Sequence, residues 1–183
     1  MFRDNSLMPK EVIRLAALGT LAQEGRKSYA QLANEVRRFT SHFRGPTLDV
    51  MATSIELLRF EGLIDAEEES AGPGETILSV TEAGRKELGE LLRANVRAPS
   101  GDFNRLVIAL KLRFLDLLEP QEQGEQIEAL AEICEAELAR LIDLRQARAG
   151  GNRPFIRWLE HDIGRLEADV VWFRRLAQEL PKA

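Results

Sequence analysis

Apolar residues recur at intervals of three and four along the first third of the chain, the spacing of helices that are buried on one side. Glycine, alone or followed by proline, interrupts this spacing where the predicted helices end. The capping-box pattern of Ser28 and Gln31 marks the start of the second helix. The pattern therefore predicts three helices, over residues 9–24, 29–39 and 47–61.

Alternation of apolar and polar residues replaces the helical spacing after Gly62. Leu63 opens a predicted strand, a Gly-Pro-Gly turn at residues 72–74 reverses the chain, and alternate residues from Thr76 to Val80 predict a second strand. Thr81 then caps a further helix, which is expected to end near residue 93. Three helices, a hairpin and a helix in this order are the layout of a winged helix-turn-helix domain.

The second half of the chain has no strand pattern and is predicted to be all helix. The Pro-Ser-Gly stretch at residues 99–101 indicates a linker, so we place a domain boundary near residue 98, between domains 1–97 and 98–183. The predicted fold class is mostly α, a winged-helix domain followed by a helical dimerisation domain. Its three C-terminal helices are expected over residues 102–118, 120–148 and from Pro154 onward.

A heptad seam runs along the last helix, where apolar residues step by four and three. A helix of this length carries more apolar surface than the three-helix half can cover by itself, so the pattern predicts a homodimer. The predicted interface residues are Leu159, Ile163, Leu166, Val170, Phe173 and Leu180.

Composition describes a soluble globular chain, with 44% hydrophobic and 30% charged residues. Its formal net charge of -5 gives no general attraction for nucleic acid, so any DNA contact must come from a local basic patch. Residues 26 to 44 provide such a patch, because this segment contains five basic residues and a single acidic one, Glu35. The basic residues are Arg26, Lys27, Arg37, Arg38 and Arg44. The predicted hairpin is instead acidic, with Glu67, Glu68 and Glu69.

Several other classes of protein receive no support from the sequence. The single cysteine, Cys134, excludes an intrachain disulfide, and the N-terminus lacks the apolar core of a signal peptide. The most apolar run, residues 103–118, is too short and too charged to span a bilayer, so a cytoplasmic protein is expected. No Gly-rich phosphate loop or paired metal-ligand spacing occurs, and we predict no catalytic residue, metal or cofactor.

Two sequence signatures carry a resemblance to a known family. Leu57-Leu58-Arg-Phe-Glu61-Gly62-Leu63-Ile64 and the later Ile77-Leu-Ser-Val-Thr81-Glu82-Ala83-Gly84-Arg85 are similar to the L-x-x-E-G-L-I and L-T-x-x-G-R signatures of PadR-like transcriptional regulators. The run at residues 103–118, Leu117-Leu118-Glu-Pro120 and the Trp172-Phe173 pair in a final helix strengthen the resemblance. It implies a homodimeric repressor that binds a pseudo-palindromic operator and is released by a small aromatic effector such as a phenolic acid.

The resemblance and the basic patch together place DNA contact on the second and third helices and their connector. Phosphate contacts are predicted for Arg37, Arg38 and Arg44, and more weakly for Ser28, Ser41 and His42. Base-edge contacts are predicted for Thr47, Asp49 and Thr53. Each prediction has a structural alternative. Asp49 could instead be a first-turn carboxylate that interacts favourably with the helix dipole, and Arg37 and Arg38 could be solvent-exposed residues at a helix end. The acidic hairpin departs from the family pattern, and we do not expect it to contact DNA.

Effector binding is predicted at aromatic residues of the C-terminal half, with packing in the core or dimer as the alternative. The candidates are Phe103, Phe114, Trp158, His161 and Trp172. A second function of a different class is also open. In it, the chain is a winged-helix adaptor that binds another protein through its acidic hairpin and helical tail, without reading DNA sequence.

Overall fold

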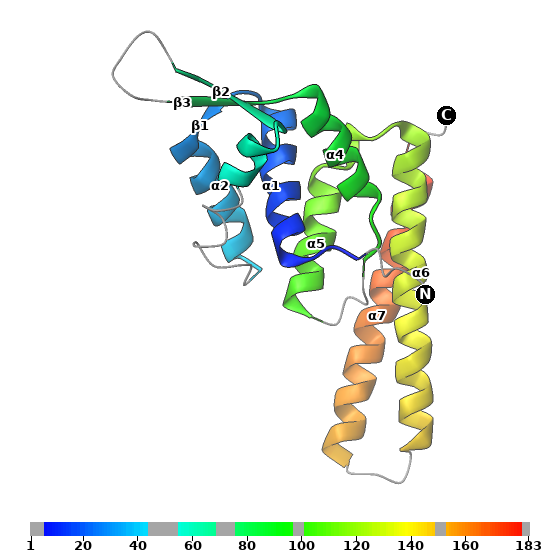
Figure 1. Cartoon of the computed structure of the whole chain (residues 1–183). Helices are drawn as coiled ribbons and strands as arrows, with labels where there is room; N and C mark the ends of the chain where they lie inside the picture. The colour runs from blue at the N-terminus through cyan, green and yellow to red at the C-terminus, as the bar shows by residue number, and fades with distance from the viewer. Residues whose placement is uncertain (1–5, 44–54, 69–75, 97–100, 149–152, 181–183) are drawn as a thin grey trace, which may run out of the picture. The chain divides into compact units, whose positions relative to one another are not determined.

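The computed structural model describes residues 6–43, 55–68, 76–96, 101–148 and 153–180. These residues are mostly helical and include one small antiparallel sheet (Figure 1). Contacts divide the chain into two compact units, the first comprising Met1–Asn95 with Gly101–Leu118 and the second Val96–Ser100 with Glu119–Ala183. In the described part of the chain, no helix is long and apolar enough to cross a membrane.

The first unit is organised around α1 (Pro9–Glu24), which is buried along most of its length. Three further helices pack against it: α2 (Tyr29–Ser41), α4 (Glu82–Arg93) and α5 (Asp102–Arg113). Figure 1 shows α1 between α2 and α5. The helix starts and ends predicted from glycine and capping residues are confirmed for α1 and α4, and α2 extends two residues beyond the predicted end.

The sheet has three antiparallel strands in the order β1-β3-β2. Strands β2 (Ile64–Glu68) and β3 (Thr76–Val80) form the predicted wing hairpin. Strand β1 (Lys27–Ser28) pairs with the other side of β3, with Lys27 opposite Leu78. Strand β1 was not predicted, because two residues are too few to show an alternation. Its pairing fixes the start of α2 beside the wing.

The two ends of the wing are fastened to each other at Gly62 and Thr81. Gly62, at a φ of 71°, ends the helical segment 55–60, and the Leu63 N–H donates to the Leu58 carbonyl at 2.9 Å. The Thr81 hydroxyl donates to the Gly62 carbonyl at 2.8 Å and accepts the Gly84 N–H at 3.0 Å. A Cβ at Gly84 would collide with the Leu63 carbonyl, so only glycine allows this approach.

The helix predicted over residues 102–118 is wrong in its last five residues, because α5 ends at Arg113 and the 3₁₀ turn η1 (Leu115–Leu117) follows. Phe114 turns inward at this break and is fully buried, where a Cβ on Gly19 would come within 2.5 Å of its ring. Burial of this ring attaches α5 and η1 to the first unit. The sequence had placed both in the C-terminal domain.

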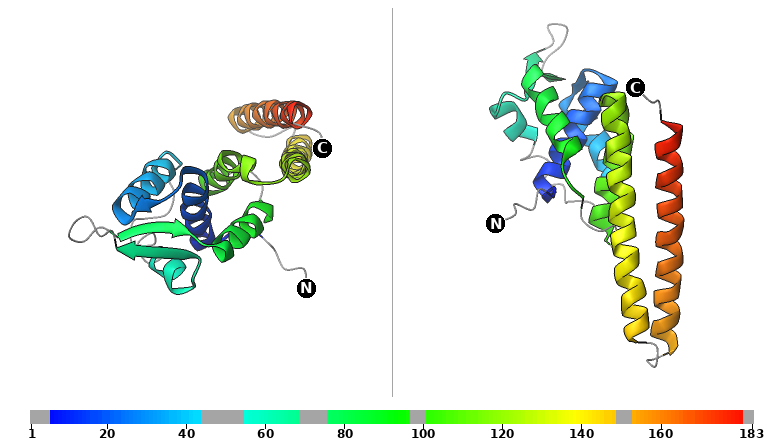
Figure 2. Two further views of the ribbon diagram at one scale, coloured as in Figure 1. Left: turned by 90° about the horizontal axis from the view of Figure 1, so that it is seen from above. Right: turned by 90° about the vertical axis from the view of Figure 1, so that its right-hand side faces the viewer.

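The second unit is a pair of long helices, α6 (Pro120–Ala147) and α7 (Arg153–Glu179), which run side by side in the right-hand view of Figure 2. Arg174 of α7 binds Glu135 of α6 through bidentate hydrogen bonds, from Nε to Oε1 at 3.0 Å and from Nη2 to Oε2 at 3.0 Å. The predicted heptad seam packs within this pair. Its buried members on α7 are Leu159, Ile163, Leu166 and Phe173, and the buried apolar residues of α6 are Ile127, Leu130, Ala131 and Cys134.

This packing corrects the predicted dimer interface. Four of its six residues are buried against α6 of the same chain, while Val170 and Leu180 are half-buried. Periodicity correctly indicated a helical partner, but it could not indicate which helix. The apolar residues that α7 leaves exposed lie off the seam: Phe155, Trp158, Val171 and Trp172.

Candidate nucleic-acid interface

Helix α2 is amphipathic, and its solvent-facing side is the candidate interface. Leu32, Val36 and Thr40, spaced by four, are buried and hold the helix in the unit. The opposite side carries exposed polar residues: Gln31, Asn34, Arg37, Arg38, Ser41 and His42. Amide and guanidinium groups of this kind suit contacts with a phosphate backbone.

Ser28 does not belong to this exposed side, which corrects its predicted phosphate contact. The residue is 1% exposed, because β1 places its side chain under the start of α2. Its hydroxyl accepts the Gln31 N–H, and its own N–H donates to Gln31 Oε1 at 3.0 Å. Ser28 is therefore the N-cap of α2, as its capping-box pattern predicted.

The other predicted phosphate contacts at the end of α2 are exposed, but only some of their side chains are free of hydrogen bonds to their own helix. The Ser41 hydroxyl donates to the Arg38 carbonyl at 3.0 Å, and His42 Nδ1 lies 2.7 Å from the same oxygen. Both side chains thus bond to the last turn of their own helix. Arg37 and Arg38 are exposed and have no ion-pair partner among the described residues. Arg44, Thr47, Asp49 and Thr53 lie outside those residues, and their roles stay predictions.

An open hollow of about 420 Å³ lies beside α2. Its lining combines cations and amides from the segment before α2 and from the helix itself: Arg26, Lys27, Gln31, Asn34, Glu35 and Arg38. Lys27 Nζ is 3.0 Å from Glu24, and Arg26 pairs with Glu67 of the wing. One wing carboxylate thus neutralises a cation of the hollow. Arg38 is the cation of this lining without an ion pair in the described structure.

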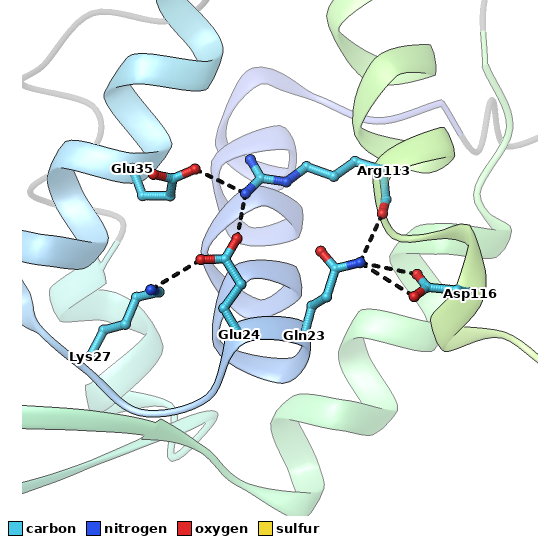
Figure 3. A network of polar contacts seen from close by, with 6 residues as sticks. All are labelled: Gln23, Glu24, Lys27, Glu35, Arg113 and Asp116. Carbon is cyan, nitrogen blue, oxygen red and sulfur yellow. Dashed lines mark hydrogen bonds and ion pairs between the residues drawn. The ribbon is translucent and has the colours of Figure 1, made fainter.

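Arg113, the last residue of α5, joins three helices in one polar network (Figure 3). Its Nη2 lies 2.7 Å from Glu24 of α1 and 3.0 Å from Glu35 of α2. Its guanidinium is 4.7 Å from the centroid of the Phe39 ring. Although burial raises the pKa of the Glu24 carboxyl, contacts with Lys27 and Arg113 outweigh this effect and hold the pKa below its usual value.

Neither the amides of this interface, Gln31 and Asn34, nor its link to Arg113 was predicted from the sequence. Gln31, Asn34 and Arg38 recur at intervals of three and four along α2, so their shared face could have been found from helical spacing. Arg113 could not have been found in this way, because it lies far along the chain from Glu35 and only the fold brings them together.

The structure separates the predicted effector residues. Phe114 belongs to the core and is inaccessible, which corrects its predicted role. Phe103 is half-buried on α5, whereas Trp158, His161 and Trp172 are exposed on α7. Trp158 and Trp172 are fourteen residues apart, or about 21 Å along a helix, so they do not line one small-molecule pocket within a chain.

A second hollow, of about 380 Å³, lies in the first unit between α1, α4 and η1. Its lining combines three cations with several apolar side chains, and none of the five predicted effector residues contributes to it. The lining residues are Ala22, Arg85, Lys86, Leu88, Gly89, Glu90, Leu92, Arg93 and Leu117.

Helices, a short strand and a wing hairpin in this order, followed by a helical pair, define a winged helix-turn-helix protein with a helical tail. Residues 2–177 match the family model described as "Putative AphA-like transcriptional regulator". The chain belongs to this family of transcriptional regulators, which is not a family of enzymes. A comparison with curated protein sequences found no match.

Several solved structures are similar to the chain. PadR from Bacillus subtilis, in complex with operator DNA, is 19% identical, with 91% of this chain and 98% of that chain covered and a TM-score of 0.42. A PadR-like transcriptional regulator from Bacillus cereus is 20% identical, with coverages of 91% and 96% and a TM-score of 0.41. For Bacillus subtilis PadR in complex with p-coumaric acid, the identity is 18%, the coverages are 94% and 97%, and the TM-score is 0.37.

Proposed function

We propose that this transcriptional regulator binds operator DNA as a homodimer, and that the exposed side of α2 holds the phosphate backbone. The observation that carries the proposal is Arg38, an exposed arginine in a polar hollow that has no ion pair among the described residues. An arginine in this state can bind a phosphate without first losing a carboxylate partner. The net charge of -5 makes such a local cation necessary.

We propose that phosphate contacts and base contacts come from different helices of the first unit. Phosphate contacts by Arg37 and Arg38 would fix the orientation of the domain without reading sequence. The helix that ends at Gly62 would enter the major groove, with Thr47, Asp49 and Thr53 as its predicted base contacts. Two copies related by a two-fold axis would meet successive major grooves about 34 Å apart, on a pseudo-palindromic operator.

Arg38→Ala is expected to weaken operator and non-operator DNA binding alike, and to lower the slope of log K against log salt by about 0.9, because one phosphate contact is lost. Fluorescence anisotropy across a salt series measures both quantities. Arg148→Ala, which removes an exposed arginine near the end of α6, is the control and should leave the slope unchanged. An unchanged slope in Arg38→Ala would contradict the phosphate role, and a wild-type chain that binds no DNA would favour the protein adaptor.

The exposed aromatic face of α7 supports the dimer. The Phe155 and Trp158 rings stack at a centroid distance of 6.0 Å, and Trp158 and Trp172 are 54% and 51% exposed. Fourteen residues complete nearly four helical turns, so both tryptophans lie on about the same side of α7. Exposed aromatic residues along one face are typical of an interface, and an isologous pairing would cover this face in both copies.

Trp172→Glu is expected to raise the dissociation constant of the dimer about 30-fold, the effect of removing one interface hot spot. Sedimentation equilibrium at micromolar concentration measures it. Val171→Glu is the matched control, because it adds the same charge at an equally exposed neighbouring residue that points about 100° away on the helix. A wild-type monomer, or equal effects of the two substitutions, would contradict this interface.

Repression, and release by a small aromatic effector, stay predictions of the family resemblance. The hollow between α1, α4 and η1 supports the prediction of an effector, because its lining combines cations with apolar side chains, as binding of an aromatic acid requires. Arg85 and Arg93 could meet a carboxylate, and Leu88 and Leu92 offer apolar contact for a ring. We therefore propose this hollow, in place of the predicted aromatic cluster, as the effector site.

A further inference from the structure

We propose that Arg113 is a positioning residue for DNA binding, which keeps Arg38 available to phosphate by occupying the carboxylate of Glu35. The inference rests on the proposed phosphate role of Arg38. It assigns a function to a residue on α5, a helix that carries none of the predicted DNA contacts.

Glu35 and Arg38 are spaced so that they could form an ion pair with each other. They are three residues apart on α2, the spacing at which acidic and basic side chains pair along a helix surface, and both line the same hollow. In the structure, however, Glu35 Oε1 lies 3.0 Å from Arg113 Nη2, and Arg38 has no ion pair among the described residues. Arg113 and Arg38 therefore compete for one carboxylate.

The surroundings of Arg113 favour it in this competition. Its side chain is only 18% exposed, and its guanidinium lies 4.7 Å from the Phe39 ring centroid and 5.2 Å from that of Phe114. A second carboxylate, Glu24, contacts the same nitrogen at 2.7 Å. A partly buried ion pair against aromatic rings is screened less by water and salt than an exposed pair with Arg38 would be.

The backbone at Arg113 is also held in place. Gln23 of α1 donates its side-chain amide to the Arg113 carbonyl at 3.1 Å and to Asp116 at 3.2 Å (Figure 3). The end of α5 is thus tied to α1 independently of the guanidinium. A neutral residue at position 113 would release Glu35 while these bonds retain the local backbone.

Arg113→Gln is expected to reproduce much of the effect of Arg38→Ala. With its partner gone, Glu35 would pair with Arg38, and a phosphate would have to displace that carboxylate. The affinity for non-operator DNA should fall several-fold at low salt, and the salt slope should fall by up to about 0.9. Measurement by fluorescence anisotropy would be accompanied by thermal unfolding, to confirm that each variant is folded.

The decisive variant is Arg113→Gln combined with Glu35→Gln, which removes both members of the pair. It has the net charge of the wild type and leaves Arg38 without a competing carboxylate, so affinity and slope should return to wild-type values. Arg113→Gln with Glu128→Gln has the same net charge but keeps the Glu35 carboxylate, so this control should stay weak. If the Glu35 double variant is as weak as Arg113→Gln, or the control recovers equally, the inference is overturned.

Glu35→Gln alone keeps the inference testable if Arg113→Gln does not fold. Since Arg113 already neutralises Glu35, this substitution should leave the salt slope unchanged, and a rise of about 0.9 would show that Glu35 had been occupying Arg38. Arg38→Ala measured in parallel separates the two proposals. If Arg38→Ala lowers the salt slope but the Arg113 variants do not behave as expected, only the positioning role of Arg113 is wrong. If Arg38→Ala leaves the slope unchanged, both proposals are wrong.

Discussion

Phe114→Ala is expected to lower the free energy of unfolding by about 3–5 kcal/mol, the usual cost of truncating a fully buried phenylalanine. The Phe114 ring is 0% exposed and fills the space that Gly19 leaves open on α1. Its loss would leave a cavity between α1 and the end of α5, because the helices around it are held by other contacts. Urea denaturation followed by circular dichroism measures the difference.

Phe60→Ala is the matched control for this substitution. Phe60 is 91% exposed near the end of the helical segment 55–60, so the same change of side chain should alter the free energy of unfolding by less than about 0.5 kcal/mol. Similar losses at the two positions would contradict the assignment of Phe114 to the core. They would also reopen its predicted role in effector binding.

The second large effect concerns the pH dependence of stability at Lys111. This residue of α5 is 2% exposed, and its Nζ donates to the Leu92 carbonyl in the last turn of α4. Burial lowers the pKa of Lys111 to about 8 from 10.5. The folded state therefore binds fewer protons than the unfolded state between these values, and stability should rise with pH across this window. The cost of charging Lys111 is fully present below pH 8.

Lowering the pKa of Lys111 from 10.5 to about 8 corresponds to a change in stability of about 3 kcal/mol between pH 8 and pH 10.5. Lys111→Met isolates it from other titrating groups. The difference in unfolding free energy between the wild type and Lys111→Met should change by this amount over the window, in favour of the wild type at high pH. A difference that is constant with pH would contradict the lowered pKa.

Much of the secondary structure could be predicted, because the signals that end a helix are local. Gly25 and Gly62 adopt positive φ and end their helices as expected. Ser28 and Thr81 cap the helices that their side chains indicated, and Pro120 begins α6. These residues act through backbone conformations and hydrogen bonds within a few positions of themselves, so no tertiary contact is needed to infer them.

The choice of partner for each apolar face could not be predicted. A heptad seam requires a second helix, and the sequence cannot distinguish α6 of the same chain from α7 of another. The inward turn of Phe114 likewise depends on Gly19, which lies far from it in the sequence. Strand β1 exists because β3 is beside it, since two residues have no strand pattern of their own. Each of these outcomes follows from packing between distant segments.

Some features of the candidate site could likewise be predicted from the sequence, and others depend on the tertiary structure. The sequence by itself determined the wing, the amphipathic α2 and the arginines on its exposed side, because charge and helical spacing are properties of neighbouring residues. Only the tertiary structure decided that Ser28 is buried, that Glu67 pairs with Arg26, and that Arg113 holds Glu35. An ion pair depends on a separation of a few ångströms between side chains, and for residues distant in the chain only the fold sets that separation.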